Sequence, residues 1–216
     1  NDPVAFGVEV LGEHFTPDIV RVLESVRDNA VTVAKSANAT GKTHGAARVA
    51  VWFYKCYRGA KVYTTAAPPF KNLKDLLWGE IGAVIDNRPA LFQEDRITSL
   101  HIARSKNEFI TGVAIPTSGN EKDRESKFSG KHAPALLFVV DEGDAVPDEI
   151  YRGIESCMSG GFVRLLILFN PKQKAGPVYH KIRSKAAAVV TLSALTHPNV
   201  VTGENVIPGA VDRETT

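Results

Sequence analysis

Cysteine and methionine are scarce in this chain, and long apolar runs are missing. Among its 216 residues there are two cysteines and one methionine. Cys56 and Cys157 are too few for a disulfide framework, and neither stands in a metal-binding spacing, which favours a reducing, intracellular setting. No apolar run approaches the roughly 20 residues that a membrane-spanning helix needs. We therefore expect a globular protein with one substantial core and no membrane partner.

Acidic residues are missing from one long stretch. No Asp or Glu occurs between Glu155 and Glu204, although the net charge of the whole chain is only +2. The same stretch contains the basic residues Arg164, Lys172, Lys174, Lys181, Arg183 and Lys185. A segment of one sign either faces a polyanion or forms a solvated surface, and charge alone leaves both interpretations open.

A phosphate-binding pattern occupies residues 36–43. They read Ser-Ala-Asn-Ala-Thr-Gly-Lys-Thr and fit G-x-x-x-x-G-K-S/T, except that Ser36 replaces the first glycine. Gly41 permits a tight turn, Lys42 is expected to reach the β and γ phosphates, and Thr43 to bind Mg²⁺. The predicted nucleotide-binding residues are Ser36, Ala37, Asn38, Ala39, Thr40, Gly41, Lys42 and Thr43. Taken alone, the pattern also fits a Ser- and Gly-rich turn.

An uninterrupted apolar run, 135–140, ends in Asp141 and Glu142. Continuous apolar runs are typical of parallel strands covered on both faces, and the carboxyl ends of such strands lie at the ligand crevice. Asp141 is the predicted Mg²⁺ ligand beside Thr43, and Glu142 the predicted catalytic base that orients and deprotonates water. The two acids alone also fit a surface turn. With the upstream loop they predict an Mg²⁺-dependent ATPase or GTPase.

Strand-like and helix-like runs alternate along the chain. The predicted strands are 30–34, 61–64, 97–103, 109–115, 135–140, 163–169 and 186–192. The predicted helices are 16–26, 43–57, 68–81, 147–154 and one around 179–182. This alternation predicts an α/β fold with a mostly parallel central sheet flanked by helices. We expect an irregular arm at 1–15, an ATPase domain at 16–196, and a tail or linker start at 197–216. Within the ATPase domain, residues 117–132 are expected to form a mobile polar loop, with or without one helical turn.

Four separate places resemble the ATPase domain of the large subunit of phage DNA-packaging terminases. They are 33–43, 64–81, 130–142, and 169–171 with 197–200 further on. The resemblance spans roughly residues 16 to 211 and implies a P-loop NTPase of ASCE type. It implies that the catalytic strand lies beside the strand of the phosphate loop. The chain does not begin with methionine, which favours a trimmed piece of such a protein.

The resemblance also implies a motor that couples ATP hydrolysis to translocation of double-stranded DNA into a procapsid. The implied partners are DNA, the portal protein and the small terminase subunit, in the cytoplasm of the host. The chain is expected to form a homo-oligomeric ring when assembled and to be a monomer in isolation. The family adds a nuclease domain, and we expect no cleavage activity from this chain.

Further site residues are expected around the nucleotide. Lys35 acts in cis on the γ-phosphate, or it is a plain surface lysine. Arg124, in the polar loop, is the candidate arginine that acts in trans from a neighbouring subunit. Asn170 is expected to sense the γ-phosphate and couple it to DNA-gripping loops. No glutamine precedes Thr16, where the family places one near the adenine, so Phe15 either stacks on the base or packs in the core.

Two other classes of protein stay open. A helicase-like or recombination ATPase would separate strands in an unwinding assay, and a nucleotide-dependent switch would bind ATP but hydrolyse it poorly. Glu142 argues against the switch. Contact with DNA is expected through backbone phosphates, because a packaging motor must ignore sequence. The candidate contacts are Lys127, Lys131, Lys172 and Lys174, each with a solvated surface position as its alternative.

Overall fold

The structure is a computed structural model that describes residues 1–171 and 174–216. Its centre is an eight-stranded sheet in the order β3-β4-β5-β2-β6-β7-β1-β8. The strands from β5 to β8 in this order run parallel, while β4 is antiparallel to β3 and β5. The strands are β1 (Val31–Ser36), β2 (Ala60–Ala66), β3 (Arg96–Thr98), β4 (His101–Ser105), β5 (Glu108–Gly112), β6 (Ala135–Asp141), β7 (Phe162–Phe169) and β8 (Ala188–Leu192). The predicted α/β fold with a mostly parallel sheet is confirmed.

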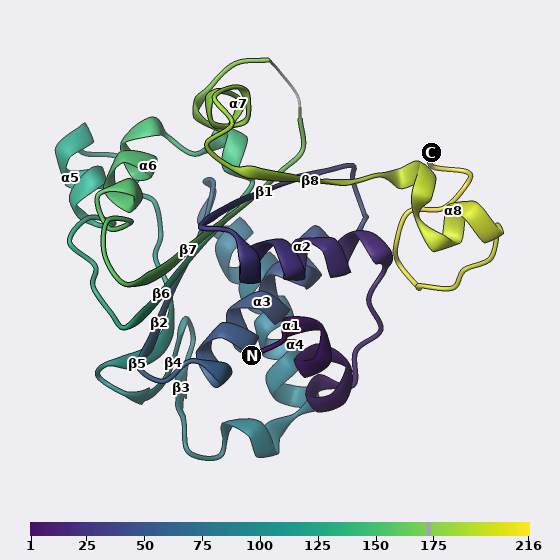
Figure 1. Ribbon diagram of the computed structural model, residues 1–216, viewed down its shortest axis with the longest axis horizontal. Coiled ribbons are helices and arrows are strands. Elements are labelled where there is room, and N and C mark those ends of the chain that lie inside the picture. Colours follow the sequence, from purple (N-terminus) through teal and green to yellow (C-terminus); the bar gives the residue numbers. More distant parts are fainter. Residues whose placement is uncertain (172–173) are drawn as a thin grey trace.

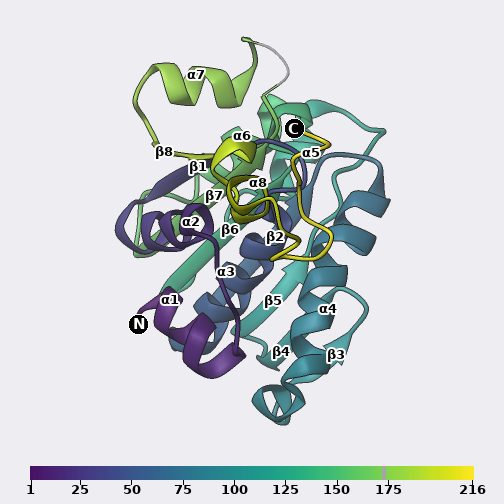
Figure 2. The ribbon, with the colours of Figure 1, turned by 90° about the vertical axis from the view of Figure 1, so that its right-hand side faces the viewer.

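Helices cover both faces of the sheet, as Figures 1 and 2 show. Helices α2, α3 and α4 pack on one face, and α6 and α7 pack on the other. The helices are α1 (Pro3–Ala5), α2 (Pro17–Asp28), α3 (Lys42–Cys56), α4 (Trp78–Asn87), α5 (Glu121–Ser126), α6 (Asp148–Glu155), α7 (Pro177–Arg183) and α8 (Pro198–Thr202). Turns of π-helix lie at Phe6–Leu11 and Asn72–Leu77, and 3₁₀ turns at Pro89–Phe92, Gly143–Ala145 and Ala194–Thr196. Within the described residues, no helix is both long and apolar enough to cross a membrane.

Strand β6 is apolar throughout because both of its faces are covered. Leu137 and Val139 pack with the residues of α3, whereas Phe138 and Val140 pack with those of α6. All seven residues of the strand are buried, as expected for a central parallel strand. The first polar side chain that the strand presents is therefore Asp141, at its carboxyl end.

The catalytic strand does not lie beside the strand of the phosphate loop, so that expectation is wrong. Strand β7 pairs with β1 on one edge and with β6 on the other. The last five residues of β7 are buried, and such a strand is stable where both faces and both edges are covered. Asn170 follows β7 and therefore emerges between the phosphate loop and Asp141.

The N-terminal residues are more regular than the irregular arm that we expected. Asp2 caps α1 by accepting hydrogen bonds from Val4 N and Ala5 N at 2.8 and 2.9 Å. A Cβ on Gly7 would lie 2.2 Å from the ring of Phe15, so the π-helical turn packs closely against residue 15. This segment is too short for its periodicity to be recognised in the sequence. It carries residues 12–15 to the start of α3.

One other predicted segment differs from the structure, and the helical turn that the sequence allowed in the polar loop is present. The predicted strand 97–103 is divided into β3 and β4 by a tight turn, since Thr98 pairs directly with His101. The polar loop 117–132 contains α5, whose first turn is capped by Asn120: its side chain accepts from Asp123 N at 2.9 Å. The predicted start of α2 is confirmed, because Thr16 Oγ1 accepts from Ile19 N at 3.3 Å and Pro17 is the first helical residue.

Candidate active site

The phosphate loop joins β1 to α3, as the sequence predicts. Gly41 has φ 84°, a left-handed conformation that glycine adopts without strain. Ser36, in the place of the usual first glycine, is 1% exposed. Its hydroxyl bonds to Ala37 O and to Thr40 Oγ1, both at 2.6 Å. The serine therefore links the beginning of the loop to its end, a role that the sequence pattern did not reveal.

The predicted metal ligands lie side by side. Thr43 Oγ1 donates a hydrogen bond to Asp141 Oδ2 at 2.9 Å, across 98 residues of sequence. Asp141 is 2% exposed. Burial raises the pKa of its carboxyl, while the charge of Lys42 and the bond from Thr43 act in the opposite direction. An oxygen pair of this kind fits the preference of Mg²⁺ for hard ligands.

Mg²⁺ would need oxygen ligands beyond Thr43 and Asp141. Across the described part of the chain, no group of three or more His, Cys, Asp or Glu side chains is arranged to hold a metal. A protein site with one carboxylate and one hydroxyl is typical where substrate phosphates and water complete the Mg²⁺ shell. The residues present therefore fit a metal that arrives with a nucleotide.

Glu142 follows directly and contacts the lysine of the loop. Its Oε1 lies 3.0 Å from Lys42 Nζ, and the two side chains are 26% and 14% exposed. The backbone of Glu142 has φ 51°, an uncommon conformation that often marks a functional site. The turn sends the chain away from the sheet after β6 and leaves the Glu142 carboxylate beside the phosphate loop.

Asn170 connects the phosphate loop to the strand between β1 and β6. Its Nδ2 donates to Ser36 O at 2.9 Å and to Asn38 Oδ1 at 3.0 Å. A shift of the loop would therefore move Asn170 and the end of β7. This contact agrees with the coupling role expected from the resemblance, which stays a prediction.

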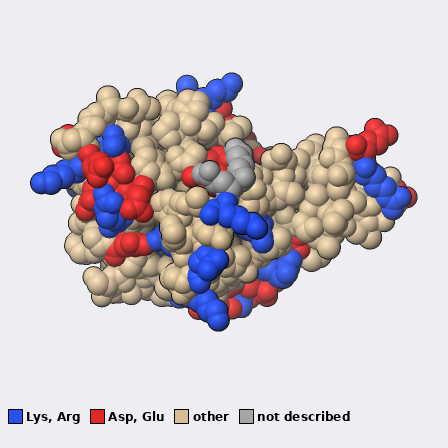
Figure 3. Space-filling model, turned by 90° about the horizontal axis from the view of Figure 1, so that it is seen from above, with Lys and Arg blue, Asp and Glu red and all other residues tan. Residues whose placement is uncertain are grey.

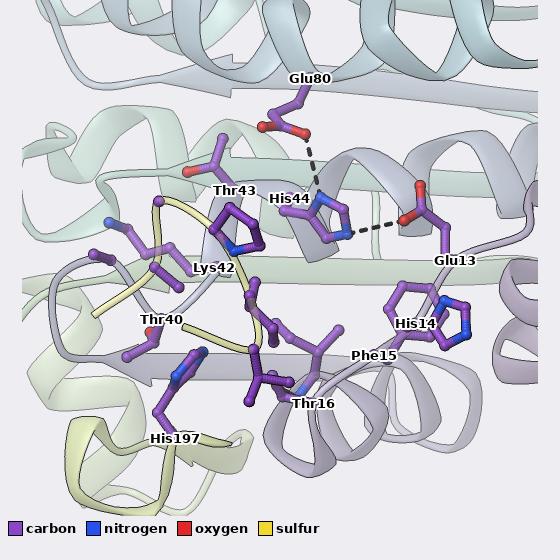
Figure 4. A pocket seen from close by; sticks show the side chains of 18 of the residues that line it. Glu13, His14, Phe15, Thr16, Thr40, Lys42, Thr43, His44, Glu80 and His197 are labelled. Atoms are coloured by element: carbon purple, nitrogen blue, oxygen red, sulfur yellow. Dashed lines mark hydrogen bonds and ion pairs between the residues drawn. The ribbon is translucent and has the colours of Figure 1, made fainter. Parts of the chain in front are cut away.

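A cavity of about 770 Å³ opens beside the phosphate loop (Figure 4). Its lining comes from four separate parts of the chain: 12–16 with Ile19, 39–44, the helical residues Leu76 and Glu80, and the C-terminal segment with His197 and 206–210. Pockets of this volume hold small molecules the size of a nucleotide. The phosphate loop forms one end of the cavity, and the arm, α4 and the C-terminal segment form the remaining walls.

A charged network that the sequence reasoning missed forms one wall of this cavity. His44 lies between two carboxylates, 3.4 Å from Glu13 and 3.4 Å from Glu80, as the dashed lines of Figure 4 show. Arg48 is 6% exposed and pairs with both, at 2.8 Å from Glu13. His44 and Arg48 are four residues apart, and Arg48 lies within an apolar stretch of the helix, 45–54, which was the available signal.

The network shifts the titration of its members. Burial by itself raises the pKa of Glu13, but hydrogen bonds from His44 and Arg48 bring it down to about 2. Burial lowers the pKa of His44, but its bonds to Glu13 and Glu80 outweigh burial, and its pKa is raised overall. Next to the start of α3, the wall thus pairs the carboxylates of Glu13 and Glu80 with the cationic groups of His44 and Arg48.

Phe15 packs against the core, one of the two alternatives that the sequence left open. Its ring packs against Gly7 and edge-on against His44, with centroids 6.3 Å apart. It also lines the cavity. The ring is therefore part of the packing of the N-terminal arm, and its stacking on a base stays a prediction.

Neither Lys35 nor Arg124 lines the cavity beside the phosphate loop. Lys35 lines a second hollow of about 560 Å³, together with Asn38, Asn170 and residues that follow β8, and does not line the cavity that contains Lys42. Arg124 pairs with Glu149 of α6 and donates to Gly119 O at 3.0 Å. Both residues keep their expected roles only as predictions.

The acid-free stretch is less available to a polyanion than its sequence suggests. Arg164 donates to Val26 O and Arg27 O at the end of α2, at 3.0 and 3.1 Å, and Lys181 pairs with Glu155. Of the predicted DNA contacts, Lys131 lies over the ring of Tyr63. Lys127 and Lys174 are exposed, and Lys172 lies outside the described residues.

Charges of both signs also meet over α5 and α6, at the left of Figure 3. Arg152 pairs there with Glu121, Glu125 and Asp148, at 3.3, 3.4 and 2.8 Å. Its side chain is 44% exposed, so this is a solvated network of surface charges rather than a buried one.

No profile of a known protein family matches the chain. A probable terminase large subunit of Enterobacteria phage P7 is 24% identical over 164 residues, which cover 73% of this chain and 32% of that protein. The chain thus spans about a third of the length of this curated relative.

Solved structures share the fold more completely. A variant of the large terminase ATPase domain of Thermus phage P74-26 has a TM-score of 0.68 at 15% identity, covering 96% of this chain and 95% of that chain. The large terminase of bacteriophage HK97 has a TM-score of 0.60 at 15% identity, covering 83% and 39%. That of a thermophilic bacteriophage in complex with ADP has a TM-score of 0.60 at 12% identity, covering 83% and 46%. The expected resemblance is confirmed, and the chain has the P-loop fold of terminase ATPase domains.

Proposed function

We propose that this chain hydrolyses ATP and that this hydrolysis drives double-stranded viral DNA into a procapsid. The observation that carries the proposal is the hydrogen bond of 2.9 Å between Thr43 and Asp141. It joins a phosphate loop to a carboxylate at the end of a buried strand, with Glu142 next in the chain. The similarity to a terminase large subunit supports the motor function over a helicase-like one.

Each residue has a physical role in this proposal. Backbone N–H groups of residues 37–43 bind the phosphates, and Lys42 contacts the β and γ phosphates. Thr43 and Asp141 hold Mg²⁺, which offsets the negative charge of the phosphates. Glu142 orients a water molecule and accepts its proton.

The ion pair between Lys42 and Glu142 links binding to this chemistry. The lysine lies 3.0 Å from the carboxylate, and a nucleotide phosphate would compete for the same ammonium group. Once Lys42 turns to the phosphate, the carboxylate of Glu142 is released to accept a proton from water. Asn170 then reports the occupancy of the loop to β7 through its bonds to residues 36 and 38.

The assembly is part of the proposal. The chain would act in a homo-oligomeric ring on the portal protein with the small terminase subunit, in the host cytoplasm, and would be a monomer in isolation. Arg124 would reach the nucleotide of a neighbouring subunit only after its pair with Glu149 opens. Nuclease activity is not expected from these residues.

Glu142→Gln tests the proposal most directly. The variant keeps the size of the side chain but cannot accept a proton, so phosphate release should fall by at least about 100-fold while ATP binding persists. Turnover is measured as released phosphate, and binding by fluorescence of a labelled ATP. Glu121→Gln, at an exposed glutamate of α5, is the matched control and should retain full activity. Undiminished hydrolysis in Glu142→Gln would refute the catalytic assignment.

A further inference from the structure

The segment after β8 returns to the phosphate loop. Figure 1 shows α8 beyond the carboxyl end of β8, and the chain then comes back, since Val211 N donates to Ala39 O at 2.9 Å. Residues 206–210, here called the strap, line the cavity just before that bond. The strap therefore lies between a contact with the loop and the helix α8.

One buried amide holds the strap in place. Asn199 is 2% exposed, and its Nδ2 donates to Ile207 O at 2.9 Å while its Oδ1 accepts from Ile207 N at 2.8 Å. Both polar groups of one strap residue are thus paired with a single side chain. A buried pair of this kind fixes position, because the loss of one partner leaves the others unsatisfied.

The start of the segment is fixed to α2. Asp18 Oδ2 accepts from Ser193 N at 2.9 Å and from Thr196 Oγ1 at 3.3 Å. Arg21 of the same helix donates to Thr191 O at 3.1 Å. Because α2 also carries Thr16 and Ile19 in the cavity wall, the strap and the opposite wall share one rigid support.

His197 presents a polar atom to the cavity. It is 4% exposed, it lines the cavity, and Figure 4 shows its ring beside Thr40. Its Nδ1 accepts from Asn199 N at 3.3 Å, so in the neutral ring the proton resides on Nε2. Nε2 is therefore a hydrogen-bond donor at the end of the cavity formed by the loop and the C-terminal segment.

We infer that the His197-Pro198-Asn199 segment recognises the nucleoside part of the bound nucleotide. His197 donates from Nε2 to the nucleotide, and Asn199 is a positioning residue that holds the strap against the sugar and base. The inference rests on the proposed nucleotide function, since it assigns the phosphates to residues 37–43. The sequence had singled out this tripeptide without giving it a role.

The test compares ATP with inorganic tripolyphosphate, which has the phosphates but no nucleoside. Asn199→Ala should raise the Kd for ATP by about tenfold, the loss of roughly two hydrogen bonds, and leave the Kd for tripolyphosphate within about twofold. In turnover, KM should rise while kcat at saturating ATP stays unchanged. Thermal unfolding of each variant establishes that it is folded.

Two further variants keep the test decisive if Asn199→Ala does not fold. His197→Asn retains an acceptor for the start of α8, because Asn is a good N-cap, but is too short to reach the nucleotide. It should raise the Kd for ATP about fivefold and leave the Kd for tripolyphosphate unchanged. Val201→Ala, at a residue of α8 that is 61% exposed, is the control and should bind ATP like the unmodified chain.

The outcomes separate this inference from the proposed function. If Asn199→Ala and His197→Asn weaken the binding of ATP and of tripolyphosphate equally, the segment does not recognise the nucleoside. The same conclusion follows if neither variant changes ATP binding. In both cases the nucleotide function stands. If the unmodified chain binds neither ligand, the nucleotide function itself is wrong, and the inference fails with it.

Discussion

The two sides of the candidate nucleotide site are built in different ways. The phosphate side is residues 36–43 with Asp141, Glu142 and Asn170, at the ends of three neighbouring strands, β1, β7 and β6. The proposed nucleoside side is made of residues 12–16, His44, Arg48, Glu80, His197 and the strap. The first side follows from the backbone of a sheet, whereas the second depends on side chains from the arm, two helices and the tail. The phosphate side is therefore recognisable in sequence, and the nucleoside side becomes visible only in the fold.

Lys42→Ala should give the largest effect and isolates the phosphate side. The variant removes the charge beside Glu142 and the predicted contact to the phosphates, so turnover should fall by about 100- to 1,000-fold. Tripolyphosphate binding should be lost together with ATP binding. A change on the nucleoside side, by contrast, should weaken the binding of ATP alone. Phosphate release and ligand titration measure the two quantities.

Lys35→Ala is the comparison for that variant. If Lys35 stabilises the γ-phosphate in cis, as predicted, turnover should fall by at least about tenfold with little change in ATP binding. A rate equal to that of the unmodified chain would make Lys35 a surface lysine of the second hollow.

The elements of the sheet were predictable because their signals are local. The run 135–140 is apolar on every residue, and it is buried on both faces. Thr16 and Pro17 mark the start of α2 by capping chemistry that acts within three residues. The contact of Thr43 with Asp141 followed from placing both at one edge of a parallel sheet.

The missed features depend on contacts between distant residues. The position of β7 between β1 and β6 is set by competition among several apolar strands, and no single strand encodes its neighbour. Glu13, Arg48 and Glu80 are ordinary charged residues until the fold brings α4 and the arm to α3. Likewise the amide pair of Asn199 with Ile207 is visible only after the tail has turned back.

Arg48→Met tests whether the charged wall supports the nucleoside side. Arg48 is 6% exposed, and its loss would leave Glu13 and Glu80 beside each other without their main cation. We expect the free energy of unfolding to fall by about 2 kcal/mol, less than for a fully buried pair because Glu80 is partly exposed. The variant should bind ATP more weakly, whereas its binding of tripolyphosphate should not change. Urea denaturation and ligand titration are the measurements.

Arg152→Met is the matched control for that change. Arg152 also has three acidic neighbours, but its side chain is 44% exposed, so its loss should leave the free energy of unfolding almost unchanged. If both variants lost equal stability, the buried network would be no more than a surface cluster, and the contrast between the two sides would lose one of its supports.

The smallest expected effect is a pH dependence of stability that comes from Glu13 and His44 in the charged wall. Glu13 has its pKa lowered to about 2, so its contribution to stability is present above its unfolded pKa and is lost as the pH falls through about 2. His44 has its pKa raised from 6.5 by Glu13 and Glu80, against burial and the charge of Arg48. Its contribution is complete below pH 6.5 and is lost as the pH rises through the higher folded value.

His44→Gln should therefore lower the free energy of unfolding most in mild acid. The difference in unfolding free energy between the unmodified chain and the variant should shrink as the buffer goes from about pH 6 to about pH 8. It should stay below about 1 kcal/mol, because a third of the ring is exposed. Urea denaturation across this range measures the difference. A difference that grew with pH would mean that the neutral imidazole is the form that the network stabilises, and that Glu13 and Glu80 are held by Arg48 alone.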